Sequence, residues 1–476
     1  LSQDDLISRG VKVCTMTLDR RSVWSRECGF RDVCSLALPL VVSTSSFALM
    51  YFCDRLMLTM YSTEDMASVM QASALSWSTV SFPLGIAAYS MAFVAQYRGA
   101  NQKHRIGAVF WHTCMIAIFA IPIFVLIAWF SPTIFQSFQH PEDLVDREIL
   151  YLRIMTFGLP GMVIATAMNS FFVGLERPLG VMWIDVFASA SNVLLDYLLI
   201  FGPGMFPEWG LAGAGWATVI SIWLKVVIYA VHMVFQSDRE DFQFGIGRCW
   251  DGDLFKRILR FGVPNGLQFF LEGGAFTLVI LFLGKLGSLV VGATTLAFSV
   301  NIVAFVPIVG VGMAVTTMVG NQVGRGKPKL ARRATWNGLF IALVYSGIFA
   351  WAYFFKPHWF LLFHQLDEQG LQELRTWTEF LLRFVAAYCI FDAIQIVFAS
   401  AIKGAGDTTF TVMTFVIGTG SMVVVGMVGE SFLVDVTAIT IWWWSLLTLF
   451  LFSLAVVFAV RFFHGRWMSM TIIGPE

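Results

Sequence analysis

Long apolar runs separated by short polar segments recur along the whole chain. Each run approaches or exceeds the ~20 residues that a membrane-spanning helix needs, and none shows the alternation typical of an outer-membrane barrel strand. Twelve helices are predicted, at residues 33–60, 66–95, 106–130, 149–173, 180–201, 211–235, 258–283, 289–319, 334–355, 378–402, 409–428 and 434–463. The pattern therefore predicts an all-α integral membrane protein with twelve transmembrane helices.

The longest polar stretch between these runs divides them into two sets of six. It reads QSDREDFQFGIGRCWDGDLFKR and lies between the sixth and seventh runs. The expected parts are an N-terminal tail at 1–32, a first lobe at 33–235, a linker at 236–257, a second lobe at 258–463 and a C-terminal tail at 464–476. Because each lobe has an even number of spans, the two lobes would be related by a pseudo-two-fold axis along the membrane normal.

An internal repeat supports this division into lobes. Under a shift of 225 residues the matching pairs are Pro39 with Pro264, Gln96 with Asn321, Gly99 with Gly324 and Trp111 with Trp336, and a shift of 230 pairs Gly174 with Gly404. The paired residues occupy equivalent loops and helices in the two halves, which carries more weight than the identities themselves. The sequence therefore indicates a duplicated scaffold.

Lys and Arg are unevenly shared between the short loops. The loops after the second, fourth, eighth and tenth helices hold Arg98, Lys103, Arg105, Arg177, Arg325, Lys327, Lys329, Arg332, Arg333 and Lys403. The opposite set of loops holds Arg147, Arg153, Lys285, Lys356 and Arg375. Because cytoplasmic loops are enriched in Lys and Arg, we expect a multi-pass protein of the cytoplasmic membrane with both termini in the cytoplasm.

The overall composition excludes several other classes of protein. Hydrophobic residues make up 57% of the chain and charged residues 13%, the mean hydropathy is +0.74, and the formal net charge is zero. A neutral chain gives no reason to expect a nucleic-acid partner. The seven His and seven Cys form no HExxH, GxSxG or paired-cysteine motif, so a membrane-embedded enzyme is disfavoured and no resident metal or disulfide is expected.

Among the ionisable residues of the predicted spans, five acids and one lysine are candidates for a functional role. They are Asp54, Asp185, Asp196, Lys225, Glu272 and Asp392. Since a carboxylate near the bilayer centre costs about 2.5–3.5 kcal/mol, such residues usually serve a function. For Asp54 a local ion pair with the adjacent Arg55 is an alternative explanation.

The span at 180–201 carries a polar face. Asp185, Ser189, Asn192 and Asp196 fall at i, i+4, i+7 and i+11, so their side chains share one side of the helix and must face protein or water. Lys225 on the next span is expected to neutralise Asp185. That pairing would leave Asp196 as the titrating group.

The second lobe has its own acids. Glu272 follows Pro264 in FGVPNGLQFFLEGGAF, and Asp392 lies one helical turn from Gln395. Hydrogen-bonded pairing between helices is the alternative to a functional role for each acid. The repeat reproduces none of the acids: the shifts place Val279 opposite Asp54, Phe47 opposite Glu272 and Met162 opposite Asp392.

The order of four motifs, QYRGAN, GLAGAGWATVIS, NQVGRG and AIKGAGDTT, resembles that of the MATE (multidrug and toxic compound extrusion) transporters over nearly the whole chain. The resemblance implies two six-helix lobes around a V-shaped cavity, and export of organic, often cationic or amphipathic, compounds in exchange for H⁺ or Na⁺. It also implies a first-lobe cation site at Asp54, Asn192, Asp196 and Thr218, and second-lobe cation-binding acids at Glu272 and Asp392.

From these residues we expect an ion-coupled antiporter. A buried carboxylate can take up a proton, or it can stay ionised and bind sodium through neighbouring oxygen atoms. Four further polar residues of the spans are candidates for the substrate cavity, namely Asp185, Ser189, Lys225 and Gln395. Beyond the coupling ion, the small organic substrate and the lipid bilayer we expect no cofactor or partner, and we expect a monomer. A lipid or lipid-linked-precursor flippase is the nearest alternative, although it would need a basic cavity rather than an acidic one.

Overall fold

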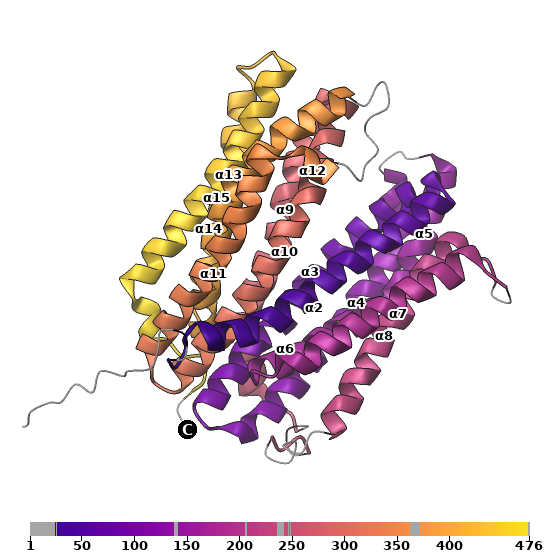
Figure 1. The fold of residues 1–476 in the computed structure, drawn as a ribbon. Coiled ribbons are helices and arrows are strands. Elements are labelled where there is room, and N and C mark those ends of the chain that lie inside the picture. The colour runs from indigo at the N-terminus through magenta and orange to yellow at the C-terminus, as the bar shows by residue number, and fades with distance from the viewer. Residues whose placement is uncertain are drawn as a thin grey trace, which may run out of the picture.

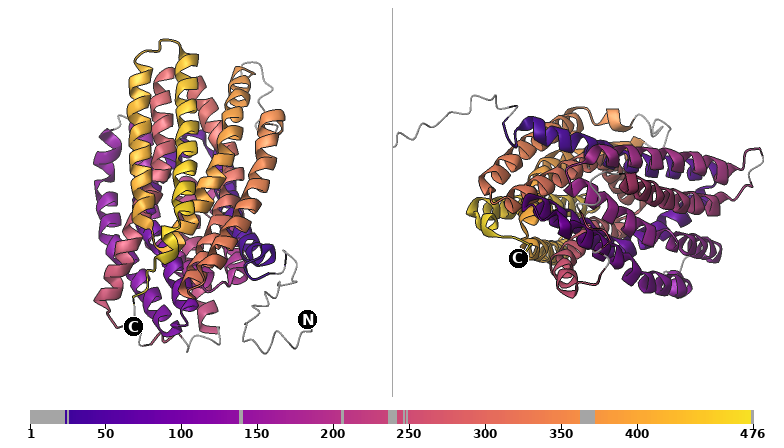
Figure 2. Two further views of the ribbon diagram at one scale, coloured as in Figure 1. Left: turned by 90° about the vertical axis from the view of Figure 1, so that its left-hand side faces the viewer. Right: turned by 90° about the horizontal axis from the view of Figure 1, so that it is seen from below.

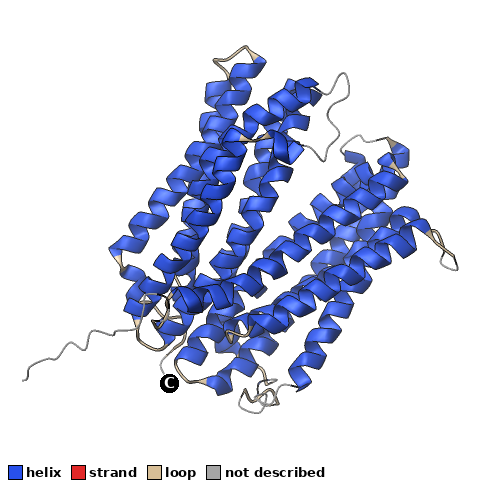
Figure 3. Ribbon diagram, viewed as in Figure 1, coloured by secondary structure: helices blue, strands red, loops and turns tan. Residues whose placement is uncertain are grey.

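The computed structural model describes residue 24 and residues 26–137, 141–204, 207–235, 242–245, 247, 249–361 and 372–474. The helices in chain order are α2 (Phe30–Tyr61), α3 (Thr63–Gly99), α4 (Ile106–Ser137), α5 (Glu142–Thr156), α6 (Leu159–Gly174), α7 (Pro178–Phe201), α8 (Gly210–Phe235), α9 (Gly252–Leu283), α10 (Ser288–Gly324), α11 (Pro328–Phe355), α12 (His358–Leu361), α13 (Gln372–Ala405), α14 (Thr408–Glu430) and α15 (Val436–His464). Short 3₁₀ turns occur at η1 (Lys103–Arg105), η4 (Gly284–Leu286) and η6 (Arg466–Ser469). The described residues contain no β-strand (Figure 3).

Eleven of these helices are individually long and apolar enough to cross a membrane, and the bent pair α5 and α6 supplies a twelfth span. Every predicted span falls on one of these helices or on the bent pair, so the all-α membrane fold is confirmed. The predicted run at 149–173 is in fact two helices that meet at 41°. The break lies at Phe157 and Gly158, and Pro160 is the second residue of α6, in the first turn, where its missing N–H is tolerated.

The helices form two bundles (Figure 1). Helices α2–α8 make up one lobe and α9–α15 the other, and the lobes converge at one end and diverge at the other. The converging end, which we call the closed end, holds the start of α2 and the end of α15 (Figure 2). Contacts between the lobes run mainly through α2, α3, α9 and α10.

The closed end is built from residues that the repeat relates to one another. A Cβ atom added to Gly99 would lie 2.1 Å from the carbonyl oxygen of Asn321, and one added to Gly324 would lie 2.2 Å from that of Gln96. Only glycine permits so close an approach of two backbones. The paired motifs of the sequence therefore meet each other, across the contact between α3 and α10.

Side chains at the same positions join the two lobes. The Gln96 amide donates to the carbonyl of Gly404 at 2.9 Å and accepts a hydrogen bond from the backbone N–H of Ile472 at 3.0 Å. The Asn321 amide donates to the Glu176 carboxylate at 2.8 Å. One side-chain amide from each lobe thus forms hydrogen bonds with the other lobe. We call these contacts of Gln96 and Asn321 the amide seal.

Helix α9 begins at Gly252 rather than at residue 258, so the end of the expected linker is helical. Asp251 caps the helix by accepting a hydrogen bond from the backbone N–H of Leu254 at 3.0 Å, and it also pairs with Arg105 at 3.0 Å. The Leu254 hydrogen bond, followed by the Arg105 charge, holds the pKa of Asp251 below its ordinary value. The beginning of the linker, residues 236–241, lies outside the described residues.

Candidate functional site

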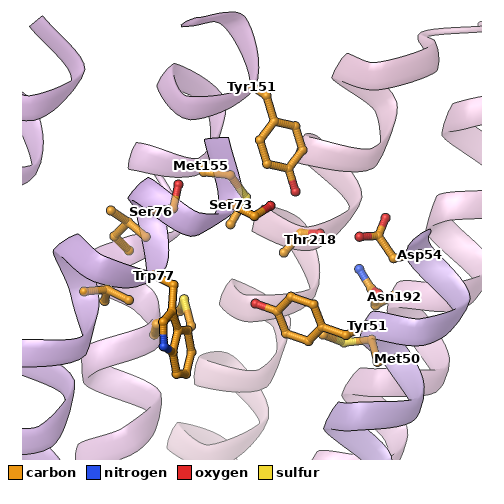
Figure 4. A pocket seen from close by; sticks show the side chains of 13 residues that line it. Met50, Tyr51, Asp54, Ser73, Ser76, Trp77, Tyr151, Met155, Asn192 and Thr218 are labelled. Carbon is orange, nitrogen blue, oxygen red and sulfur yellow. The ribbon is translucent and has the colours of Figure 1, made fainter. Parts of the chain in front are cut away.

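A pocket lies in the first lobe, among helices α2, α3, α5, α6, α7 and α8 (Figure 4). Its lining residues are Met50, Tyr51, Asp54, Ser73, Ser76, Trp77, Val80, Tyr151, Met155, Leu159, Met162, Asn192 and Thr218. Three of the four residues that the resemblance assigns to a first-lobe cation site are among them. The fourth, Asp196, is fully buried one helical turn from Asn192 on α7.

Several buried polar atoms of this group have no hydrogen-bond partner among the described residues. They are one carboxylate oxygen of Asp54, both carboxylate oxygens of Asp196, and both the oxygen and the nitrogen of the Asn192 amide. Leaving such groups unpaired costs about 1–3 kcal/mol each, so their concentration in one place points to a ligand that binds oxygen atoms. We call Asp54, Asn192, Asp196 and Thr218 the first-lobe cluster.

The donor chemistry of the first-lobe cluster fits a proton or a small hard cation. Asp54 and Asp196 interact electrostatically with each other, and two like charges in low dielectric are stabilised by a cation or by protonation of one of them. The Thr218 hydroxyl donates to the carbonyl of Ala214 at 3.1 Å, which leaves its oxygen lone pairs available to a ligand. Within the described residues no group of three or more His, Cys, Asp and Glu side chains could hold a metal ion.

The ion pair considered for Asp54 and Arg55 does not form in the described structure. Asp54 is 6% exposed, whereas the Arg55 side chain points to the exposed surface of α2. Ion pairs within 4 Å in the described part of the chain do not include these two residues. Asp54 therefore lines the pocket, while the Arg55 charge acts on it only electrostatically and from outside contact distance.

Sequence reasoning missed the tyrosines around the acids. Tyr151 on α5 is 3% exposed and interacts electrostatically with Asp54, Asp196 and Tyr51. Figure 4 places the Tyr151 and Tyr51 rings on opposite sides of the pocket that holds Asp54. A search restricted to charged side chains could not find these residues. Their only sequence signal is a polar aromatic residue inside an apolar run.

Asp185 lies on the same buried face of α7 as Asp196, but both of its carboxylate oxygens have bonding partners. Lys225 Nζ lies 2.8 Å from Asp185 Oδ1, and the Tyr229 hydroxyl donates to that oxygen at 3.0 Å. The Ser43 hydroxyl of α2 donates to Asp185 Oδ2. The predicted pairing of Lys225 with Asp185 is confirmed, and we call these four residues the Asp185 network.

The polar face of α7 therefore divides into two halves. Asp185, Ser189, Asn192 and Asp196 are all buried, as the spacing predicts. Of the four residues proposed for a substrate cavity, Asp185, Ser189 and Lys225 belong to this lobe, and none of them lines the pocket. One half of the face is a closed ionic network and the other half is the first-lobe cluster.

The acids of the second lobe occupy a separate place. Asp392 on α13 is 3% exposed and accepts a hydrogen bond from Gln395 Nε2, on the same helix, at 3.0 Å. Glu272 on α9 is half-buried and interacts electrostatically with Asp392 and with Lys403. The hydrogen bond to Asp392 thus comes from its own helix and not from another one. Asp392 and Glu272 are close enough to interact electrostatically.

A family model described as MatE matches the chain in two segments, residues 39–198 and 264–428. The second match begins 225 residues after the first, at residue 264 instead of 39. This is the shift that the sequence repeat indicates, so the duplication is confirmed.

Individual proteins match over most of the chain. A probable multidrug resistance protein NorM of Xanthomonas axonopodis pv. citri (strain 306) is 28% identical over 376 residues, covering 78% of this chain and 81% of that protein. An outward-facing structure of a multidrug resistance MATE family transporter of the MOP superfamily superposes with a TM-score of 0.81 at 19% identity, covering 93% of this chain and 97% of that one. The eukaryotic MATE transporter AtDTX14 superposes with a TM-score of 0.80 at 19% identity, covering 92% and 96%. At this identity the structural likeness establishes the fold.

Proposed function

Because the chain belongs to the MatE family, we propose that it is a secondary active antiporter, which exports organic, often cationic and amphipathic, compounds in exchange for H⁺ or Na⁺. The observation that carries this proposal is the first-lobe cluster, where two buried carboxylates without hydrogen-bond partners for three of their oxygens lie at a pocket lined by aromatic and Met side chains. The names of the similar proteins, multidrug resistance protein NorM and multidrug resistance MATE transporter, support the same substrate class.

We further propose that the protein lies in the cytoplasmic membrane as a monomer, with both termini in the cytoplasm. The excess of Lys and Arg in the loops at the closed end supports this orientation. The divergent end of the lobes would then face outward. In that arrangement the first-lobe cluster is reached from outside.

In the proposed cycle a cation that enters from outside binds Asp54 and Asp196. It removes the repulsion between the two carboxylates and binds the oxygen atoms of Asn192 and Asp196 that have no hydrogen-bond partner. Binding of the cation thereby biases α2 towards a different packing against its neighbours, and this second packing favours release of substrate outward. The driving force is adequate, because the membrane potential supplies about 2.3 kcal/mol per charge per 100 mV and each tenfold gradient adds ~1.4 kcal/mol.

The pocket combines acidic, aromatic and Met side chains, and this combination fits an organic cation. Tyr51, Trp77 and Tyr151 present π-faces or hydroxyl groups, and Met50 and Met155 supply adaptable surface. Aromatic faces attract organic cations, and Met side chains adjust to different shapes. The same acidic pocket would repel a pyrophosphate group, so a flippase for lipid-linked precursors is disfavoured.

The decisive experiment measures uptake of a fluorescent cationic dye such as ethidium into inverted membrane vesicles. A proton gradient and a sodium gradient are applied separately, and Asp196→Asn and Glu272→Gln are compared with the wild type. Asp146→Asn is a matched control, because Asp146 is an exposed acid on α5 away from the pocket. We expect Asp196→Asn to abolish gradient-driven uptake and Asp146→Asn to leave it intact. If neither gradient moves any of several cationic dyes in the wild type, the proposal is wrong.

A further inference from the structure

The Asp185 network connects three helices, and along α7 it lies nearer the start of the helix than the first-lobe cluster does. Ser43 belongs to α2, Asp185 to α7, and Lys225 and Tyr229 to α8. The Asn169 amide of α6 in turn donates to the Tyr229 hydroxyl at 3.5 Å. Asp185 is 6% exposed and Ser43 5%. Since Lys225 neutralises the charge and three groups bind the two oxygens, a coupling ion gains little by binding to Asp185.

The same pair of helices carries both the Asp185 network and the acids of the first-lobe cluster, in matching register. Ser43 precedes Asp54 on α2 by eleven residues, and Asp185 precedes Asp196 on α7 by eleven residues. Eleven residues are close to three full turns, or roughly 16 Å of helix. Helices α2 and α7 pack side by side, so the Ser43 contact and the two acids lie along one seam.

Helix α2 touches both lobes where it passes Ser43. The next residue, Thr44, donates to the carbonyl of Val306 on α10 at 3.4 Å, while it also bonds within its own helix to Leu40 at 2.9 Å. A Cβ on Gly310 of α10 would lie 2.9 Å from the backbone of Val41. Two adjacent residues of α2 therefore bond to different lobes: Ser43 bonds to α7 of the first lobe and Thr44 to α10 of the second. The bond to the first lobe ends on a carboxylate, and hydrogen bonds to charged groups are the stronger kind.

We propose that Asp185 is a positioning residue for the coupling site: its hydrogen bond with Ser43 sets the register of α2 against α7, and thereby the separation of Asp54 from Asp196. The inference rests on the proposed function in taking these two acids as the coupling site. Lys225 keeps Asp185 neutralised, so that the acid can hold a hydroxyl group without competing for the coupling ion. The contact also keeps α2 with the first lobe when the two lobes move apart.

The first test removes the Ser43 hydroxyl and keeps the ion pair intact. Ser43→Ala is compared with Ser46→Ala, a matched control in which the lost hydroxyl bonds only to the Ser43 carbonyl of its own helix, at 2.8 Å. Ethidium uptake into inverted vesicles is measured against the concentration of the driving cation, Na⁺ or H⁺. For Ser43→Ala we expect the half-activating cation concentration to rise about tenfold, the factor at the lower end of the range for a hydrogen bond to a charged group. For Ser46→Ala we expect no shift.

A second pair of variants separates positioning from the presence of charge. Asp185→Asn with Lys225→Met removes both charges but keeps an oxygen that can accept the Ser43 hydroxyl, whereas Asp185→Leu with Lys225→Met removes the acceptor as well. We expect the first double variant to retain the half-activating concentration of the wild type and the second to reproduce the shift of Ser43→Ala. Thermal unfolding of the purified variants identifies any general loss of folding, which would lower the maximal rate without moving the half-activating concentration.

Two results would overturn the inference. One is a half-activating concentration for Ser43→Ala equal to that of Ser46→Ala, and the other is equal behaviour of the two double variants. Asp196→Asn is measured alongside them to separate this inference from the function on which it rests. Loss of coupling in Asp196→Asn without a shift in Ser43→Ala refutes only the positioning role, whereas full coupling in Asp196→Asn refutes the assignment of the coupling site.

Discussion

Replacing Gln96 by Ala should open the closed end of the protein. The Gln96 amide makes its shorter hydrogen bonds with the carbonyl of Gly404 and the N–H of Ile472, at 2.9 and 3.0 Å, and longer ones with Ala405 and Thr471, at 3.4 and 3.2 Å. Gln96 is fully buried, and so is most of Ile472. When the amide is removed, the groups that it bound stay buried without a partner as long as the lobes remain together.

The expected size of the effect follows from these buried groups. A buried donor or acceptor left unsatisfied costs about 1–3 kcal/mol, while the same group is hydrated once the lobes part. Two such groups destabilise the closed end by roughly 2–6 kcal/mol relative to the open one, a change of about 30-fold or more in the population of the open form. The change is large enough to detect as a rate of chemical labelling.

Cys28 reports opening at this end. It is 2% exposed, and its carbonyl accepts a hydrogen bond at 2.8 Å from Asn337 of α11, in the other lobe. Burial, followed by the charges of Glu27 and Asp32, raises the pKa of the Cys28 thiol to about 12, so in the closed form the thiol is protonated and unreactive. Exposure to water returns the pKa towards its ordinary value of 9.0.

The assay is maleimide labelling of Cys28 at pH 8, in a protein whose other six Cys are replaced by Ala. We expect Gln96→Ala to label about 30-fold faster than the parent protein. Gln322→Ala is the matched control, because Gln322 is a buried amide of α10 whose side-chain oxygen makes no hydrogen bond within the described residues. If Gln96→Ala and Gln322→Ala label at the same rate, the amide seal does not hold the lobes together.

Three further predictions concern the ionisable groups. Lys225→Met should lower the free energy of unfolding by roughly 3 kcal/mol, because it leaves the Asp185 charge buried beside Ser43 and Tyr229 without its cation. It should also disturb dye transport far more than Lys225→Arg, and equal transport by both variants would count against the ion pair. Asp251→Ala should destabilise the protein by about 1 kcal/mol. Because the pKa of Asp251 is lowered in the folded state, this difference in thermal stability should be fully present above pH 3.8 and should be lost as the pH falls through the folded-state pKa. Tyr151→Phe should raise the half-activating cation concentration a few-fold, because it removes a hydroxyl dipole from the wall of the pocket at a residue on which both acids act electrostatically. An unchanged cation dependence would exclude Tyr151 from the site.

The fold was predictable because a membrane imposes a simple rule on sequence. A span needs about 20 apolar residues, and every backbone polar group in the bilayer must be paired within the protein, so apolar runs translate directly into helices. The ends of the helices were not predictable in this way. Helix α3 continues to Gly99 and α10 to Gly324, past the apolar runs, because a helix can continue into polar surroundings with its backbone hydrogen bonds intact.

The bend between α5 and α6 shows a signal that was present but not used. The sequence FGLPG lies in the middle of the run at 149–173, and its Gly and Pro residues mark the point where α5 ends and α6 begins. An apolar run by itself records only length and hydropathy. Gly158 and Pro160 are the residues that distinguish two helices from one.

Pairing of charges was predictable where an isolated charge in the membrane requires a partner. A lone Lys225 in an apolar span needs an acid, and Asp185 on the preceding helix is such an acid, so the ion pair at 2.8 Å follows from the cost of an isolated charge. The roles of Gln96 and Ser43 were not predictable. Each bonds to a residue more than a hundred positions away, and neutral amides and hydroxyl groups do not cost enough in isolation to require a partner.

The repeat and the acids together explain how a symmetric scaffold can carry an asymmetric function. Repeat-related residues build the contact between α3 and α10, where Gly99 meets Asn321 and Gly324 meets Gln96, and an interface built from equivalent surfaces lets both lobes rotate about one axis. Binding of an ion must nevertheless distinguish the two lobes. The repeat pairs Asp392 with Met162, which lines the first-lobe pocket without a charge, and pairs Asp54 with Val279, which is fully buried in the second lobe. If a cation binds Asp54 and Asp196, as we propose, it has no equivalent site across the axis. Its binding energy would then act on one lobe while the shared interface moves both.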